Sequence, residues 1–367
     1  MKRRVQFYVQ HLLGIGHVVR AMRIARALAA GPFEVELLLG GPMIEGLAPG
    51  AARLVPLPAV GAASGTFSRL VDAQGAPLTE AAMDARRDLL LGHFDRFDPD
   101  ILLIEAFPFG RRQMRFELVP LLQHARARER RVLIASSVRD ILQQETRPGR
   151  AEEYAALVER YFDLVLVHGD PALADFSASF PLAPRIAERL RYTGIVGPGS
   201  LEPAVETHDV IVSAGGGAVG GALIRAALAA RPLTRLADAR WLVVTGPNLA
   251  EALPPQPSNV ILARFLPDLP QRLAAARLSI SQAGYNTVAD LLAARCRAVL
   301  APYAGGGETE QTQRATLLEA RGLAIFARDA SPPGLARALE AALELHEPPA
   351  RPALDGARRT SEILASA

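Results

Sequence analysis

The sequence predicts an α/β protein with two domains in series, each built on a doubly wound parallel sheet. Short apolar segments alternate with helix-compatible segments along almost the whole chain, as in such folds. The chain has 367 residues, which is too long for one ordinary core. A segment with three glycines and two prolines, at residues 192–203, interrupts the alternation and predicts an interdomain linker.

The first half begins with a strand at residues 5–9 and a helix at residues 18–30. Further buried strands are expected at residues 35–39, 100–105, 132–136 and 164–167. The periodicity of the helix places Arg20, Arg23 and Arg26 on its polar side. This half predicts an N-terminal domain at residues 1–195.

The second half repeats the pattern after the linker. Its expected strands are residues 210–213, 241–245, 260–263, 278–281 and 298–301. They predict a C-terminal domain at residues 196–350. The remaining segment, residues 351–367, contains a helix at 357–365 that we expect to pack back on the first domain.

Composition excludes several classes of protein. Half of the residues are hydrophobic and 22% are charged, which argues against a disordered chain, and the single cysteine, Cys296, excludes a disulfide framework and fits a reducing cytoplasm. No window is apolar enough to predict a membrane-spanning helix. Aromatic residues make up 5%, too few for a nucleic-acid stacking surface. The scattered histidines show no metal-ligand spacing, so no metal is expected.

A glycine turn follows the first predicted strand. Gly14 and Gly16 allow the backbone to turn tightly and to present amide groups at a helix N-terminus, which attracts anions. Val19 stands where a dinucleotide fold would have its third glycine. His17 lies at the start of the helix, where it can act on substrate; alternatively, it only caps or packs.

The second domain has a similar glycine-rich turn after its first predicted strand. Ser213 is followed by Gly215, Gly216 and Gly217, which predict a cradle for a diphosphate without a metal. The sequence lacks the Gly-Lys-Ser/Thr of a P-loop. The structural alternative is that the glycines only allow a helix to pack closely on a strand.

A third strand–turn–helix segment spans residues 279–290. Gly284 permits close approach of a ligand, Asn286 and Thr287 lie at the helix start, and Asp290 could accept hydrogen bonds from two ribose hydroxyls. The alternative for Asp290 is a favourable charge near a helix N-terminus.

The next loop, at residues 301–315, is rich in glycine and then polar. Glu310 and Gln311 lie in its polar second part and predict recognition of sugar hydroxyls; a solvated loop is the alternative.

Polar residues also end two strands of the first domain. Glu105 ends one buried strand, and Arg139 with Asp140 ends the next, at the sheet edge where ligands bind. Arg139 and Asp140 could instead pair with each other. Three phenylalanines lie beside three arginines and suggest contact with an anionic membrane surface; they are Phe107, Phe109 and Phe116, beside Arg111, Arg112 and Arg115.

Taken together, these motifs resemble glycosyltransferase family 28, the MurG-like group of GT-B enzymes that use nucleotide-sugar donors. The most specific motifs fall in the order of the family; they are residues 265–268, 282–290, 301–303 and 310–315. The N-terminal motif, Gly14 to Arg20, also resembles the UDP-sugar hydrolase of pseudaminic acid synthesis.

The resemblance implies a GT-B fold, with two Rossmann-like domains and an interdomain cleft, and a metal-independent inverting glycosyltransferase. Phe265 and Leu266 would contact the nucleotide base, and Asp290 matches a ribose-binding glutamate of the family. Glu310 and Gln311 match a glutamine pair that contacts the sugar.

On this resemblance the second domain, residues 196–350, binds the donor, expected to be a UDP-sugar, without a cofactor. The first domain, residues 1–195, would bind an unknown acceptor, and the residues expected on the acceptor side are Gly14, Gly16, Arg139 and Asp140. His17 is the expected base, with Glu105 as the second candidate. Alternatives are a nucleotide-sugar hydrolase in which His17 activates water, a nonhydrolysing epimerase, and a non-catalytic sugar-nucleotide-binding protein.

Overall fold

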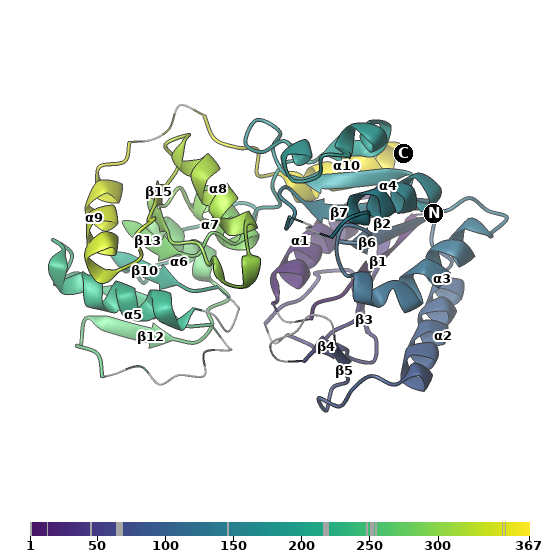
Figure 1. Cartoon of the computed structure of the whole chain (residues 1–367), viewed down its shortest axis with the longest axis horizontal. Helices are drawn as coiled ribbons and strands as arrows, with labels where there is room; N and C mark the ends of the chain where they lie inside the picture. The colour runs from purple at the N-terminus through teal and green to yellow at the C-terminus, as the bar shows by residue number, and fades with distance from the viewer. Residues whose placement is uncertain are drawn as a thin grey trace. The chain divides into compact units, whose positions relative to one another are not determined.

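The computed structural model describes residues 2–12, 14–44, 46–63, 69–144, 147–215, 220–246, 249, 253, 255–346, 348 and 350–367. The chain divides into two compact units (Figure 1). The N-terminal unit is formed by Met1–Pro171, Asp175–Val196 and Asp355–Ala367, and the C-terminal unit contains Gly197–Leu354. Two parallel-sheet α/β domains are therefore confirmed.

The N-terminal unit contains a seven-stranded parallel sheet in the order β3-β2-β1-β6-β7-β8-β9. Its strands are β1 (Arg3–Val9), β2 (Phe33–Leu39), β3 (Arg53–Pro56), β6 (Ile101–Glu105), β7 (Leu133–Arg139), β8 (Leu164–His168) and β9 (Leu190–Tyr192). A small antiparallel pair joins β4 (Gly61–Ala62) to β5 (Leu70–Val71). The expected central strands are all present, whereas the short β3 and β9 were not anticipated because they are only partly buried.

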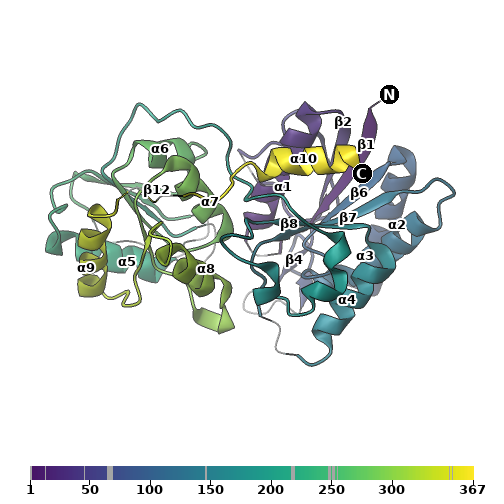
Figure 2. The same ribbon diagram turned by 90° about the horizontal axis from the view of Figure 1, so that it is seen from above.

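Helices cover both faces of this sheet. They are α1 (Gly16–Ala30), α2 (Glu80–Phe97), α3 (Arg115–Arg126), α4 (Arg150–Tyr161) and α10 (Gly356–Ser366), with 3₁₀ turns at Arg112–Met114, Phe176–Ala178 and Ala183–Arg189. Figure 2 shows α1 and α10 on one face and α2, α3 and α4 on the other. On the second face, Leu90 and Phe94 of α2 and Leu118 of α3 pack on Leu102 and Ile104 of β6.

Local sequence signals set the beginning of α2. Thr79 precedes it in an extended conformation, and its Oγ1 accepts a hydrogen bond from the backbone N–H of Ala82 at 3.2 Å. Glu80 adds negative charge to the first turn. Both features stabilise a helix N-terminus, whose first amide groups lack partners within the helix.

The C-terminal unit contains a six-stranded parallel sheet in the order β12-β11-β10-β13-β14-β15. Its strands are β10 (Val210–Ser213), β11 (Trp241–Val244), β12 (Val260–Ala263), β13 (Leu278–Ser281), β14 (Ala298–Leu300) and β15 (Ile325–Phe326). Its helices are α5 (Gly221–Ala230), α6 (Leu269–Ala275), α7 (Tyr285–Ala294), α8 (Glu310–Glu319) and α9 (Pro332–Leu343), with 3₁₀ turns at Arg231–Leu233 and Gly305–Gly307. Ile224 of α5 and Leu339 of α9 pack on Val212 and Ile280, which places the core on that face.

The first helix differs from expectation at one position. Arg20 was assigned to the polar side of the helix, but only 2% of it is exposed. The residue can be buried because its guanidinium contacts the Glu105 carboxylate. An arginine at a core-facing position thus indicates an internal ion pair rather than solvent.

Candidate active site

The N-terminal unit brings two predicted motifs together at one edge of its sheet. β1 and β6 are neighbours, but the chain continues from β1 to β2 on one side and from β6 to β7 on the other. Ligands bind at the carboxyl ends of strands at such a switch point. The turn with Gly14 and Gly16 follows β1, and Glu105 ends β6. Apart from Gly14 and its two chain neighbours, no atom of the described residues lies within 4 Å of where a Cβ on Gly14 would be, so the turn is open there.

His17 and Glu105 form a hydrogen-bonded pair at this edge. His17 Nδ1 lies 2.9 Å from Glu105 Oε1, and the Arg20 guanidinium contacts the same oxygen. His17 and Arg20 reach Glu105 together because residues three apart share one side of a helix. On the other carboxylate oxygen, Ser137 Oγ donates a hydrogen bond to Oε2 at 2.6 Å.

The charges of this pair follow from burial and from its neighbours. Burial, followed by the positive charge of Arg111, lowers the pKa of His17 to about 3. Burial acts to raise the pKa of Glu105, but Arg20, His17 and Ser137 more than offset it and the pKa lies at about 2. At neutral pH the pair is therefore a neutral imidazole and a carboxylate.

This arrangement gives the two residues different chemical capacities. A carboxylate only accepts hydrogen bonds, so Nδ1 carries the imidazole hydrogen and Nε2 holds the lone pair. Nε2 can then accept a proton from a bound hydroxyl group. Glu105 has no exposed surface and lies behind the imidazole, a position suited to orienting His17.

The neighbouring strand end holds the other predicted residues of this unit. Arg139 ends β7 and is half-buried, and Asp140 is buried, with its Oδ1 accepting a hydrogen bond from Ile141 N at 2.8 Å. Arg111, which was expected to face a membrane surface, instead lies near enough to His17 for its charge to act on that side chain. Its Nε donates to Gln10 O at 2.8 Å, and burial followed by the charge of Arg139 lowers its pKa to about 10.

The expected membrane contact through aromatic residues is wrong for two of the three phenylalanines. Phe107 and Phe109 are 1% and 8% exposed. Phe109 packs edge-on against the rings of Phe176 and Phe180, with centroids 5.4 and 5.2 Å away. Burial of these rings in the core leaves them no surface with which to insert into a bilayer. Along the described segments, no helix is long and apolar enough to span a membrane.

The C-terminal unit has its own switch point between β10 and β13. Ser213 and Ser281 pair at the carboxyl ends of these strands, and Gly215 follows with a φ of +74°, a conformation that favours glycine. Gly216 and Gly217 lie outside the described residues. A Cβ on Gly220 would overlap Ala214, so this glycine permits α5 to pack closely on the loop after β10.

The next strand leads into the predicted ribose-binding segment. Gly284 is the N-cap of α7, which starts at Tyr285, and the position of its missing Cβ has only Thr287 Oγ1 near it, at 3.9 Å. Asn286 and Thr287 lie in the first turn and are half-buried, as is Asp290 in the second turn. All of these residues lie on or next to one helix that begins at the carboxyl end of β13.

The predicted sugar-binding residues also have contacts within the unit. Gln311 Oε1 accepts hydrogen bonds from Ala283 N at 3.1 Å and from Tyr303 N at 3.2 Å. Glu310 is 3% exposed, and its Oε1 is 2.7 Å from Nη2 of Arg314. Gln311 thereby ties the loop after β13 to the loop after β14, while its amide NH₂ group is not part of these two bonds.

Phe265 and Leu266 follow β12, which is the edge strand of the sheet. Phe265 is 39% exposed, and the Leu266 carbonyl accepts a hydrogen bond from Leu269 N at 3.2 Å at the start of α6. One backbone acceptor of this turn is thus already engaged by the helix that follows.

Comparisons with known proteins bear on the family and the fold of the chain. Residues 210–358 match the family model of the glycosyltransferase family 28 C-terminal domain. A curated relative from Symbiobacterium thermophilum is 29% identical over 339 residues, covering 88% of this chain and 84% of the relative. Its name is UDP-N-acetylglucosamine–N-acetylmuramyl-(pentapeptide) pyrophosphoryl-undecaprenol N-acetylglucosamine transferase.

Solved structures show the same fold. The calicheamicin glycosyltransferase matches with a TM-score of 0.60 at 18% identity, covering 100% of this chain and 95% of that one. MurG from Acinetobacter baumannii matches with a TM-score of 0.55 at 15% identity, covering 98% and 95%. The chain is a GT-B glycosyltransferase with a family 28 C-terminal domain.

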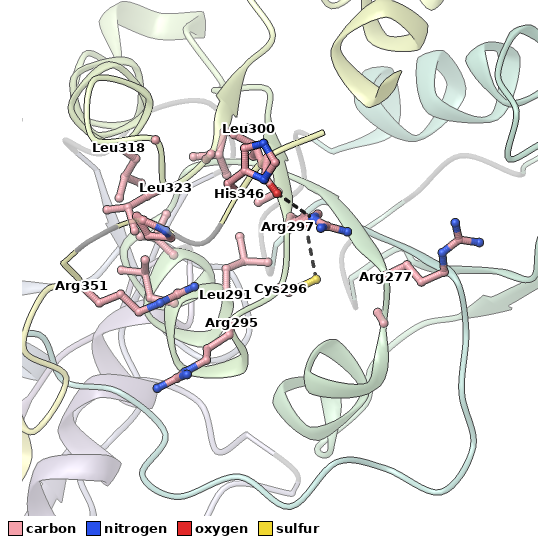
Figure 3. Close-up of a pocket in the computed structure, with 18 residues that line it drawn as sticks. Arg277, Leu291, Arg295, Cys296, Arg297, Leu300, Leu318, Leu323, His346 and Arg351 are labelled. Atoms are coloured by element: carbon pink, nitrogen blue, oxygen red, sulfur yellow. Dashed lines mark hydrogen bonds between the residues drawn. The ribbon is translucent and has the colours of Figure 1, made fainter. Parts of the chain in front are cut away.

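Figure 3 shows a cavity of about 310 Å³ in the C-terminal unit of this glycosyltransferase, and none of the predicted donor-binding residues is among its lining residues. Arg277 and Arg297, at the amino ends of β13 and β14, are among its lining residues. Arg277 lies well apart from Arg295 and Arg351, so these arginines do not converge on one point. Burial raises the pKa of the Cys296 thiol beside it to about 12, which keeps the thiol protonated.

Sequence reasoning missed several groups around His17 in this glycosyltransferase. Besides Arg20 and Arg111, these are Ser137, His168 and Thr193, all of them buried in the N-terminal unit except the half-buried Arg111. His168 follows an apolar run of four residues that was identified as a strand, and a histidine in that position was the available signal.

Proposed function

We propose that this glycosyltransferase moves a sugar from a UDP-sugar to an acceptor hydroxyl group with inversion at the anomeric carbon. The observation that carries the proposal is the His17–Glu105 pair at the switch point of the N-terminal sheet. The C-terminal unit would bind the nucleotide sugar, and the N-terminal unit the acceptor. The name of the Symbiobacterium relative, a UDP-N-acetylglucosamine-using transferase, supports the choice of uridine.

In the proposed reaction His17 Nε2 accepts the proton of the acceptor hydroxyl. The acceptor oxygen attacks the anomeric carbon as the bond to the diphosphate oxygen breaks on the opposite side. Glu105 keeps Nδ1–H oriented and stabilises the imidazolium that forms. Removing His17 with His17→Ala should therefore reduce kcat while leaving donor affinity unchanged.

The leaving diphosphate needs positive charge or hydrogen-bond donors. The loops after β10 and β13 lead into the N-termini of α5 and α7, whose amide groups and dipoles suit a diphosphate. On this basis we propose a reaction that requires no metal or cofactor. A cytoplasmic location, where nucleotide sugars are made, fits the same proposal.

The experiment is isothermal titration of the protein with UDP, dTDP, GDP and ADP in EDTA. We expect UDP to bind selectively. Asp290→Ala should weaken UDP binding by about 1–3 kcal/mol, the value of hydrogen bonds to a charged group. Glu344→Ala, at an exposed position after α9 and outside all predicted donor segments, is the control. No binding by any of the four nucleotides would refute the donor site, and unchanged affinity of Asp290→Ala would refute the ribose role.

A hydrolase is the second candidate because the same His17–Glu105 pair could activate water. UDP-sugar turnover measured without acceptor separates the two. Hydrolysis as fast as any transfer would favour the hydrolase, whereas slow hydrolysis that gives way to transfer when acceptor is added supports the transferase.

A further inference from the structure

We propose that Thr193, His168 and Ser137 form a directional chain of hydrogen bonds that orients Glu105 and, through it, fixes the tautomer of His17. The three are positioning residues for the proposed base. The inference rests on the proposed function for its catalytic consequence, but its structural part can be tested without any turnover.

The chain of bonds crosses four neighbouring strands at the carboxyl edge of the N-terminal sheet. Ser137 on β7 is directly opposite Glu105 on β6. On β8, Leu166 is opposite Ser137, and His168 lies two residues further along on the same face. Thr193 follows the last residue of β9. Strand order and register therefore place these side chains in a row.

The distances join the row into one path. Ser137 Oγ lies 2.6 Å from Glu105 Oε2 and 2.8 Å from His168 Nε2. His168 Nδ1 lies 2.9 Å from Thr193 Oγ1. Ser137 and His168 have no exposed surface and Thr193 is 2% exposed, so water does not replace these bonds.

Counting hydrogens gives the path a direction. The Ser137 hydroxyl has one hydrogen and two neighbours that could accept it, the Glu105 carboxylate and His168 Nε2. Leaving a buried carboxylate oxygen without a hydrogen-bond donor costs more free energy than leaving a neutral polar atom without one. The hydrogen of Ser137 is therefore donated to Glu105. His168 Nε2 then carries a hydrogen and donates to Ser137, and His168 Nδ1 accepts the hydrogen of Thr193.

Thr193 has two competing acceptors, the carbonyls of Gly194 at 2.9 Å and of Val167 at 3.4 Å. If Thr193 donated to either of them, His168 Nδ1 would carry the hydrogen and Ser137 would have to donate to His168. Glu105 Oε2 would then lose its donor. The charge on Glu105 therefore selects the direction from Thr193 to Glu105.

The direction of this hydrogen-bonded chain affects His17 through the other carboxylate oxygen of Glu105. Oε1 accepts from His17 and from Arg20, so both carboxylate oxygens are engaged and the carboxylate stays ionised. The charged groups that face the pair are Arg20 and Arg111, and Asp140 also faces His168. An ionised, immobile Glu105 holds the hydrogen of His17 on Nδ1 and keeps the Nε2 lone pair available.

The test compares Ser137→Ala with Ser137→Thr in the full chain. Ser137→Ala removes the hydroxyl from Glu105, whereas Ser137→Thr retains a hydroxyl on a β-branched residue that a strand accommodates. The matched control is Ser136→Ala, because Ser136 is equally buried on the same strand but donates to Phe107 O at 2.8 Å. Nitrogen NMR of labelled histidine rings reports the tautomer of His17, assigned with His17→Gln.

We expect the wild type, Ser136→Ala and Ser137→Thr to hold the hydrogen of His17 on Nδ1. Ser137→Ala should give a mixture of tautomers and lower kcat about tenfold, the effect of one hydrogen bond to a charged group, at unchanged donor KM. His168→Leu should act in the same direction. If Ser137→Ala retains the pure Nδ1–H tautomer, or if Ser137→Thr loses it to the same degree, the proposal is overturned.

The NMR measurement also separates this inference from the proposed function. A wild-type protein that binds no UDP and transfers no sugar would refute the function, while the tautomers of His17 would still test the hydrogen-bonded chain. Conversely, if the protein is an active transferase and Ser137→Ala leaves the tautomer of His17 unchanged, the proposed function stands and only this inference is refuted.

Discussion

At the scale of single residues, Arg111 has a consequence for pH dependence. It adopts a left-handed backbone conformation with a φ of +58°, uncommon for a residue with a side chain, and its positive charge lowers the pKa of His17. The folded pKa of His17, about 3, lies below its ordinary value of 6.5, so the unfolded state binds a proton that the folded state does not. Stability contributed by neutral His17 is therefore lost as the pH falls from 6.5 toward 3.

Replacing Arg111 with methionine should raise the pKa of His17, because protonated His17 would no longer be repelled by a neighbouring guanidinium. The acidic limb of the pH profile of kcat should move to higher pH, since a protonated His17 cannot act as a base. NMR titration of His17 measures the shift directly. Arg112→Met, at a more exposed site paired with Glu153, should leave the pKa of His17 unchanged. A shift of equal size in both variants would contradict the specific role of Arg111.

His17 and Glu105 could each be predicted as a candidate from the sequence, but their contact could not. Glu105 lies 88 positions from His17, and only the placement of β6 beside β1 brings it there. The contacts that link Ser137 and His168 to Glu105 could not be predicted either, because they depend on the order and register of β6, β7 and β8. Arg20 was misplaced because helical periodicity alone does not reveal a buried partner for a charged side chain.

At the scale of elements, Gly220 controls how α5 meets its sheet. Alanine at this position would place a Cβ against Ala214, so α5 would have to move away from the loop after β10. Gly220→Ala should destabilise the protein by about 1–3 kcal/mol, as overpacking does, and should weaken nucleotide binding. Denaturant unfolding and calorimetry measure the two effects. Ala222→Ser, on the exposed side of the same helix, is the control, and unchanged affinity in Gly220→Ala would contradict a phosphate-binding role for this loop.

The elements that sequence reasoning found are those with a strong apolar signal. The buried central strands, such as β6 and β10, were located to within a residue or two. The edge strands β3, β9 and β15 have two to four residues and are only partly buried, so they carry little apolar patterning. The order of the strands in each sheet could not be predicted, because pairing between strands that are distant in the chain produces no local sequence pattern.

At the scale of the whole molecule, α10 completes the N-terminal unit. It packs on α1, and Arg3 Nη1 donates to Leu364 O at 2.9 Å. Leu364 has no exposed surface. Leu364→Ala should lower the free energy of unfolding of the N-terminal unit by about 2–5 kcal/mol, the cost of a leucine-to-alanine cavity.

Calorimetry with and without UDP tests whether α10 stabilises the N-terminal unit. Because UDP would stabilise the unit that binds it, the transition that UDP shifts to higher temperature should be the one that Leu364→Ala leaves unchanged. Ala365→Ser, at an exposed position on the same helix, should alter neither transition. If Leu364→Ala instead lowered the UDP-sensitive transition alone, α10 would stabilise the C-terminal unit.

The position of α10 in the chain has a further consequence for biosynthesis. The N-terminal unit contains Asp355–Ala367, so the C-terminal unit is inserted into it between Val196 and Asp355. A ribosome must therefore make all of Gly197–Leu354 before it makes the helix that covers α1. Until then the nascent chain exposes the apolar residues of α1 on the side that α10 later covers, a surface that chaperones can recognise.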